Sequence, residues 1–227
     1  MSKRYKIHSK VYERYENFMH IIEDLETHEA IIIDPAWDEE YFTDEIERLG
    51  VKPVAIWLTH GHHDHVSAVQ MLRDFYPMPV YASEVEIDFI NSYPKGDLPP
   101  AFRELPDDVI PLADNDTLSF AGEEVRIIHT PGHSPGSICY LFSDDIITGD
   151  TLFVDGAGRA DLTGSDPEAL FHSLNRLVEE VPHHVEIHTG HAYGPSATAT
   201  LKDQIQSNPF LQRIDDQEEF IRYRMSR

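Results

Sequence analysis

Four possible metal ligands lie within six consecutive positions of this sequence. Residues 59–65 read THGHHDH, which places imidazoles or carboxylates at His60, His62, Asp64 and His65, with one spare histidine among them. These groups are ligand types for a borderline divalent metal such as zinc. In an extended chain His60 and His62 project to the same side, whereas the adjacent Asp64 and His65 cannot easily serve that same point. The spacing therefore indicates two neighbouring metal positions.

The flanking segments predict a scaffold that aims these side chains. Residues 54–58 form an apolar run typical of a buried strand. Residues 67–75 are typical of a short helix, with Val69, Leu72 and Phe75 on one side. The ligands would then lie on a strand-to-helix loop, a common position for functional residues.

Three later loops carry further possible ligands next to glycines, and each follows a predicted strand. His133 lies in TPGHSPGS, Asp150 in GDTLF and His191 in GHAYG. Glycine lets the backbone turn sharply and approach a crowded site. Each loop alone is weak evidence, because a lone loop histidine is more often a surface residue than a ligand.

The pattern THxHxDH at residues 59–65, with His63 at the variable position, resembles the signature of the metallo-β-lactamase-fold superfamily. The later loops follow in the order of that superfamily's remaining ligands. The resemblance implies two Zn²⁺ ions per chain, joined by a bridging carboxylate. One ion would be held by His60, His62 and His133, the second by Asp64, His65 and His191, and Asp150 would bridge them.

The implied chemistry is hydrolysis by a metal-bound hydroxide. Two nearby cations repel each other, and a bridging carboxylate and hydroxide lower that cost. The same arrangement lowers the pKa of bound water from about 15.7 toward about 7, which makes a nucleophile at neutral pH.

Further segments resemble the small single-domain members of the glyoxalase II-like group over nearly the whole chain. They are TPGHSPGS, GDTLF, GRADL at residues 158–162 and NPFL at residues 208–211. True β-lactamases usually lack the bridging Asp150. The resemblance implies a metal-dependent hydrolase that cleaves an acyl thioester, as hydroxyacylglutathione hydrolase does. True glyoxalase II has an extra helical domain that binds glutathione, but only about 35 residues follow His191, so the thiol carrier stays open.

A second branch, persulfide dioxygenase, is also similar. It keeps these ligand residues but uses one Fe²⁺, at the positions matching His60, His133 and Asp150, and acts on glutathione persulfide. The GDTLF segment and Ala157, where the dioxygenases usually have Cys, favour the hydrolase. A metal-binding protein without catalysis is a third interpretation, disfavoured because every ligand position is intact.

Arg159 and Tyr193 are the non-ligand candidates for catalysis, beside Asp64 as a ligand that also serves the reaction. Arg159 could bind a substrate carboxylate, and the Tyr193 hydroxyl could donate to a developing oxyanion. The alternative for Arg159 is a structural ion pair with Asp155 or Asp161. Both residues also match positions in the dioxygenases.

Composition limits the classes of partner. The chain has 41 Asp and Glu against 18 Lys and Arg, a formal net charge of −23, which argues against nucleic acid as substrate. Its N-terminus has no apolar run after the basic residues, and Cys139 is its one cysteine. We expect a cytoplasmic enzyme with a small-molecule thioester substrate, no internal disulfide and no membrane partner. The oligomeric state stays open, a homodimer included.

The order of predicted elements is strands, helices, strands, helices in two similar halves. Two mixed sheets with helices on their outer faces would satisfy this order in an α/β protein, and we expect a single domain over residues 1–227. This agrees with the αβ/βα sandwich that the resemblance implies. Strands are predicted at residues 5–11, 17–22, 30–35, 54–58, 79–82, 116–120, 124–129, 138–142, 145–148 and 185–189, and helices at 38–49, 67–75, 84–91, 167–180, 198–206 and 216–224, with a loop at 93–108.

Overall fold

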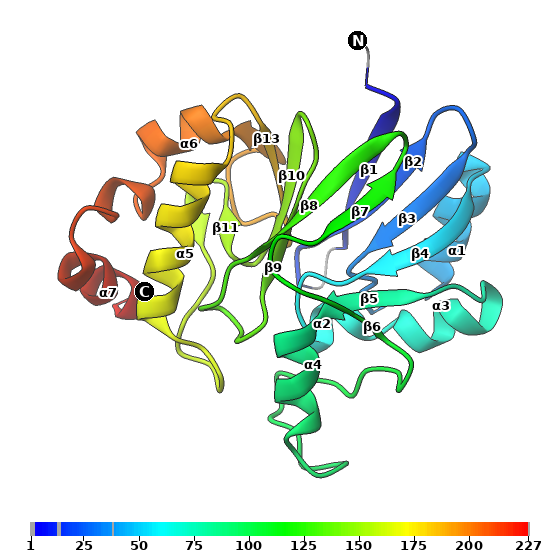
Figure 1. Cartoon of the computed structure of the whole chain (residues 1–227), viewed down its shortest axis with the longest axis horizontal. Helices are drawn as coiled ribbons and strands as arrows, with labels where there is room; N and C mark the ends of the chain where they lie inside the picture. The colour runs from blue at the N-terminus through cyan, green and yellow to red at the C-terminus, as the bar shows by residue number, and fades with distance from the viewer. Residues whose placement is uncertain (1–2, 13–14, 38, 227) are drawn as a thin grey trace.

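Two mixed sheets pack face to face, and helices cover the outer face of each (Figure 1). The computed structural model describes residues 3–12, 15–37 and 39–226. This arrangement confirms the predicted α/β class and the αβ/βα sandwich. In the described ranges no helix is both long and apolar enough to cross a membrane.

The first sheet comes from the N-terminal half and has the strand order β1-β2-β3-β4-β5-β6. Its first three strands pair antiparallel, and the remaining ones pair parallel. Helices α1 and α3 pack on its outer face through a shared apolar cluster. The bounds are β1 (Tyr5–Tyr12), β2 (Asn17–Asp24), β3 (Glu29–Ile33), α1 (Glu39–Leu49), β4 (Lys52–Trp57), α2 (His63–Val66), α3 (Val69–Phe75), β5 (Val80–Ser83), α4 (Glu84–Asn91) and β6 (Ile110–Leu112).

The second sheet comes from the C-terminal half and has the order β14-β13-β10-β9-β8-β7. Strands β10 and β13 pair parallel, and the other neighbours pair antiparallel. The bounds are β7 (Thr117–Phe120), β8 (Glu123–His129), β9 (Ile138–Leu141), β10 (Asp145–Gly149), β11 (Leu152–Phe153), β12 (Gly156–Ala157), α5 (Pro167–Glu180), β13 (Glu186–Thr189), β14 (Thr198–Thr200), α6 (Leu201–Ser207), η1 (Leu211–Arg213) and α7 (Gln217–Met225).

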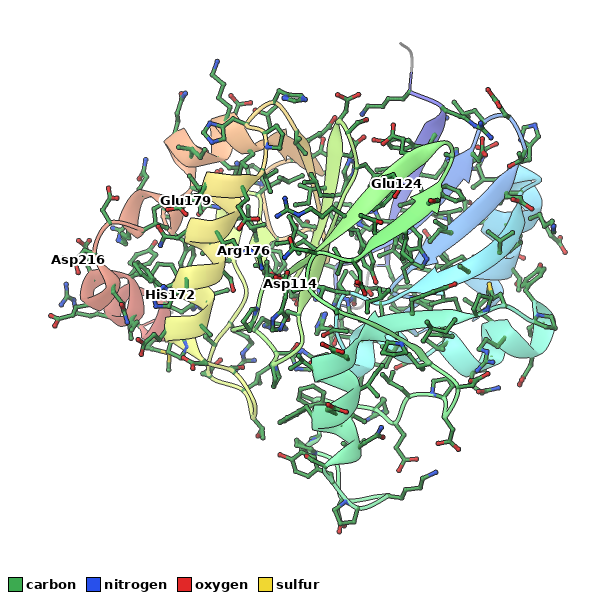
Figure 2. All side chains as sticks on the ribbon, viewed as in Figure 1. Asp114, Glu124, His172, Arg176, Glu179 and Asp216 are labelled. Atoms are coloured by element: carbon green, nitrogen blue, oxygen red, sulfur yellow. The ribbon has the colours of Figure 1, made fainter. Side chains whose placement is uncertain are left out.

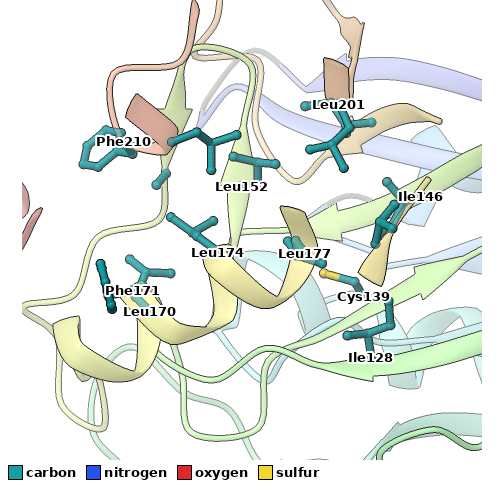
Figure 3. Packing of buried hydrophobic residues seen from close by; sticks show 14 of the residues in the cluster. Ile128, Cys139, Ile146, Leu152, Leu170, Phe171, Leu174, Leu177, Leu201 and Phe210 are labelled. Carbon is teal, nitrogen blue, oxygen red and sulfur yellow. The ribbon is translucent and has the colours of Figure 1, made fainter. Parts of the chain in front are cut away.

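Helix α5 anchors the outer layer of the second sheet. Its apolar side places Leu170, Leu174 and Leu177 in one cluster with the sheet, and Leu177 lies beside the buried Cys139 (Figure 3). Cys139 is fully buried in this cluster, where it packs as a small apolar side chain. At the helix surface, Arg176 forms an ion pair of 2.8 Å with Asp114 in the loop before β7 (Figure 2).

Several element predictions are confirmed closely. Helix α4 has the predicted bounds, and α5 begins at Pro167 after Asp166, whose side chain accepts hydrogen bonds from the backbone of Glu168 and Ala169. Residues 93–108 form an irregular segment that folds back over the metal motif, where the backbone N–H of His63 donates to the carbonyl oxygen of Ala101 at 2.7 Å. Residue 38, where the first helix is predicted to begin, lies outside the described residues.

Other element predictions are wrong. The helix predicted from residue 198 begins at Leu201, because Thr198 pairs with β13 and Thr200 caps the helix. The helix predicted for residues 67–75 begins at Val69 as α3, and a separate short helix, α2, precedes it within the metal motif. Phe75 is 62% exposed rather than packed. The short strands β6, β11 and β12 were not predicted, because two or three residues carry too little periodicity.

Candidate metal centre

The predicted ligands converge from loops that follow four different strands. The first motif follows β4, His133 follows β8, Asp150 follows β10 and His191 follows β13. Their donor atoms form two groups, each with all donor atoms within 4.8 Å of one another. One group is His60, His62 and His133, and the other is Asp64, His65 and His191.

The carboxylate of Asp150 lies between the two groups. Its Oδ2 is 3.4 Å from Nε2 of His133 in the first group and 3.3 Å from Nε2 of His191 in the second. Its Oδ1 is 3.4 Å from Nε2 of His65. The geometry therefore places a carboxylate where the resemblance implies a bridge.

Four donor atoms at the centre of the site make no hydrogen bond to the described residues. Within the described part of the chain, Nε2 of His60, His62 and His133 and Oδ1 of Asp150 are buried and make no hydrogen bond. Buried polar atoms without partners are costly in a folded protein. Four such atoms at the predicted ligand positions fit a bound divalent cation.

The opposite nitrogens of these rings are held in place from behind. In four of the histidines, Nδ1 contacts an oxygen atom of a residue that is not a predicted ligand. This contact orients the ring and leaves Nε2 facing the centre of the site. The pairs are His60 with Thr59 Oγ1 at 3.0 Å, His65 with Asp34 Oδ2 at 3.1 Å, His133 with the carbonyl of Arg159 at 2.9 Å, and His191 with the carbonyl of Tyr15 at 2.9 Å.

Asp34 is a supporting residue that the sequence analysis missed. Its carboxylate accepts hydrogen bonds from the backbone N–H of Thr59 at 2.7 Å and from the Thr59 hydroxyl at 2.5 Å, in addition to its contact with His65. It thus fixes both the start of the metal motif and one of its ligands. An acidic residue that directly ends an apolar strand is the signal that could have indicated it.

Glu86 is a second missed residue, and it joins two ligand loops. It is fully buried on α4, where Oε1 accepts from the backbone of Gly61 at 2.7 Å and Oε2 from the backbone of Gly136 at 2.7 Å and the hydroxyl of Ser134 at 3.0 Å. Gly136 leaves room for this approach, because a Cβ there would collide with the Glu86 backbone. Burial raises the pKa of Glu86 against the opposing effect of these hydrogen bonds.

Electrostatics at the centre favour positive charge. Burial alone would raise the pKa of Asp150, but His191 and His65 outweigh it and hold that pKa below its usual range. Burial lowers the pKa of His191, yet Asp150 and Asp64 raise it to about 10. Burial and the neighbouring imidazoles keep the pKa of His60 well below its usual value. The carboxylates therefore attract cations while His60 stays a neutral donor.

A cavity of about 540 Å³ opens over this centre, and it brings Arg159 and Tyr193 to the ligands. The Tyr193 ring stacks on His191, with centroids 4.6 Å apart and planes 6° apart. Burial, with the charges of Asp150 and Asp64, raises the pKa of Tyr193 to about 12, so its hydroxyl keeps its proton at neutral pH. Arg159 forms a bidentate pair with Asp161 at 2.7 and 2.9 Å, which is the structural alternative foreseen for it.

Helix-covered mixed sheets with these clustered ligands define a protein of the metallo-β-lactamase fold. Residues 17–191 match the profile of the metallo-beta-lactamase superfamily, and the chain belongs to that superfamily. It is 36% identical over 226 residues to the probable polyketide biosynthesis zinc-dependent hydrolase PksB of Bacillus subtilis (strain 168), which covers 99% of this chain and 95% of that protein.

Two further comparisons bear on the branch and the fold. The chain is 35% identical over 181 residues to the hydroxyacylglutathione hydrolase of Gloeobacter violaceus, which covers 78% of this chain and 64% of that protein. The crystal structure of ETHE1 from Myxococcus xanthus has a TM-score of 0.79 at 23% identity, over 97% of this chain and 90% of that one, and so shares the fold. The resemblance to the superfamily and its glyoxalase II-like members is confirmed.

Proposed function

We propose that this protein is a metal-dependent hydrolase that cleaves an acyl thioester. The observation that carries the proposal is the convergence of two ligand groups on Asp150 beneath a cavity. Relatives named as a zinc-dependent hydrolase and a hydroxyacylglutathione hydrolase support the same class of reaction.

The ligand groups would hold two Zn²⁺ ions, and the unpartnered inward-facing donor atoms support this assignment. We assign His60, His62 and His133 to one ion, Asp64, His65 and His191 to the other, and Asp150 to both. Ions of this kind polarise a carbonyl oxygen and acidify a water molecule, which suits attack on a carbonyl carbon. A thioester matches that chemistry because it is electrophilic and has a good leaving group.

The remaining catalytic roles fall to residues that line the cavity. The Tyr193 hydroxyl, protonated at neutral pH, donates a hydrogen bond to the oxyanion that develops on the substrate carbonyl. Asp64 faces the cavity as a carboxylate, and its Oδ2 also accepts from Asn17 Nδ2 at 3.3 Å. It can accept a hydrogen bond from the attacking water. Arg159, paired with Asp161, positions His133 through its backbone carbonyl.

The reaction can be tested with purified protein under anaerobic conditions, because hydrolysis needs no oxygen and no redox change. We expect release of free thiol from small acyl thioesters, including S-lactoylglutathione at modest efficiency. Oxygen uptake and sulfite formation with glutathione persulfide, without thiol release from any thioester, would contradict the proposal and support an iron dioxygenase.

A further inference from the structure

One wall of the cavity is built from apolar side chains. We call it the acyl wall, and it begins beside the ligands, where the rings of Phe153 and His191 lie perpendicular to each other with centroids 5.9 Å apart. Its members come from the segment after Asp150 and from the chain just before η1. They are Phe153, Val154, Ala157, Leu162 and Phe210.

Carbonyl oxygens along this wall accept hydrogen bonds from side chains of the C-terminal elements. Nδ2 of Asn208 donates to the carbonyl oxygens of Phe153 and Gly156, both at 3.0 Å. The guanidinium of Arg224 donates to the carbonyl oxygens of Ala157 at 2.9 Å and Gly158 at 3.4 Å. These donors belong to the C-terminal elements, and they occupy carbonyl oxygens that a substrate could otherwise contact. The wall therefore offers a substrate apolar surface and few polar partners.

The charged side chains that line the cavity but belong to neither ligand group also contact other protein groups. Arg159 is paired with Asp161, and Arg224 is 9% exposed and lies over the ring of Phe210. Oδ1 of Asp155 accepts from the side chains of Gln204 at 3.1 Å and Ser207 at 2.8 Å. Among the described residues, the lining thus lacks an uncommitted cation for the carboxylates or phosphates of a thiol carrier.

These observations indicate which part of a thioester, the acyl chain or the thiol carrier, lies against the wall. Biological thiol carriers contain amides and charges that need polar partners when buried, whereas an alkyl chain needs only apolar contact. We propose that the acyl wall binds an apolar, uncharged acyl chain, so that the substrates are thioesters with acyl groups of several carbons. This inference rests on the proposed thioesterase function and specifies the acyl group.

The test uses thioesters of N-acetylcysteamine, an uncharged thiol, with acetyl, butanoyl and hexanoyl groups. For the wild-type protein we expect kcat/KM to rise with acyl length, by up to about fourfold per buried methylene. A flat or falling series, with acetyl or lactoyl thioesters still hydrolysed, would overturn the acyl-wall proposal and leave the thioesterase function standing.

Substitutions test whether the dependence of kcat/KM on acyl length arises at the acyl wall. Leu162 is partly buried in a loop of the wall, and Leu162→Asp should flatten the dependence of kcat/KM on acyl length. The matched control is Phe75→Asp, because Phe75 is 62% exposed on α3 and is no part of the cavity lining. A flattened series in the control variant, or a wild-type length series in Leu162→Asp, would contradict the proposal.

A binding measurement separates the wall from catalysis. S-alkyl thioethers of N-acetylcysteamine cannot be hydrolysed, and calorimetry with the metal-loaded wild-type protein should show affinity that rises from ethyl to hexyl. The same rise without hydrolysis of any thioester would support the apolar site and contradict the thioesterase function. Affinity independent of alkyl length would overturn the acyl wall whatever the protein hydrolyses.

Discussion

Tyr193 and Arg159 line the same cavity, but they differ in the hydrogen bonds that their polar groups make. The guanidinium of Arg159 gives two of its N–H groups to Asp161, whereas the raised pKa of Tyr193 keeps its hydroxyl as a donor. The Tyr193 ring is fixed by stacking on His191. At the level of single residues, Tyr193 is therefore the better candidate for direct contact with the substrate.

Replacement of Tyr193 by Phe keeps the ring stacking and removes the hydroxyl alone. We expect kcat for thioester hydrolysis to fall about tenfold or more, because a donor to the transition state is lost, with metal content unchanged. Steady-state kinetics and metal analysis measure both. Tyr76→Phe, outside the cavity lining, serves as the control. Equal kcat in Tyr193→Phe and wild type would show that the Tyr193 hydroxyl does not stabilise the oxyanion.

The elements contribute by bringing loops together. Helix α4 packs against two ligand loops at once, and Glu86 fastens the backbone of Gly61 to that of Gly136, which lies 75 residues later in the sequence. The segment 93–108 also contacts the motif, where the carbonyl oxygen of Ala101 accepts from the backbone N–H of His63. The position of the ligands therefore depends on a helix that contributes no ligand itself.

Glu86→Gln tests this role of α4. A carboxamide has one acceptor oxygen where the carboxylate has two, so one of the loops loses its anchor. We expect metal to be lost to a chelator about tenfold more readily, as for other residues that support ligands. The matched control is Glu84→Gln, an exposed position on the same helix. Wild-type chelator sensitivity in Glu86→Gln would show that the loops keep their geometry without this contact.

The ligands are predictable from sequence because they occupy short motifs next to glycines. Asp34 and Glu86 are not, because their roles depend on contacts between segments that only the fold brings together. The same limit applies to secondary structure. Strands long enough to show alternation are predicted, whereas β14 depends on pairing with β13 and lies in a segment whose sequence predicts a helix. Phe75 follows a helical pattern but ends a helix too short to bury it.

At the scale of the whole molecule, Asp145 joins the two halves. It begins β10 in the second sheet and accepts hydrogen bonds from Tyr5 at 2.5 Å and Lys3 at 2.6 Å in the N-terminal segment, and from His188 at 2.9 Å on β13. Burial disfavours its charge, but these donors outweigh burial and lower its pKa to about 2. The ionised carboxylate therefore stabilises the contact between the halves.

This network predicts a pH dependence of stability. Since the folded pKa of Asp145 lies below its ordinary value of 3.8, its contribution is present above about pH 4 and is lost as pH falls toward 2. The difference corresponds to about 2 kcal/mol of unfolding free energy. Urea unfolding at several pH values should show this loss in wild type and a smaller one in Asp145→Asn. The half-exposed Asp144→Asn is the control, and identical acid profiles for Asp145→Asn and wild type would contradict the account.

The metal content of protein purified without added metal tests the dinuclear centre most directly. Two ligand groups joined by Asp150 predict about two divalent ions per chain by elemental analysis. Because Asp150 contacts both groups, Asp150→Ala should lower that content and abolish thioester hydrolysis. A single iron per chain, unaffected by added zinc, would contradict the dinuclear centre.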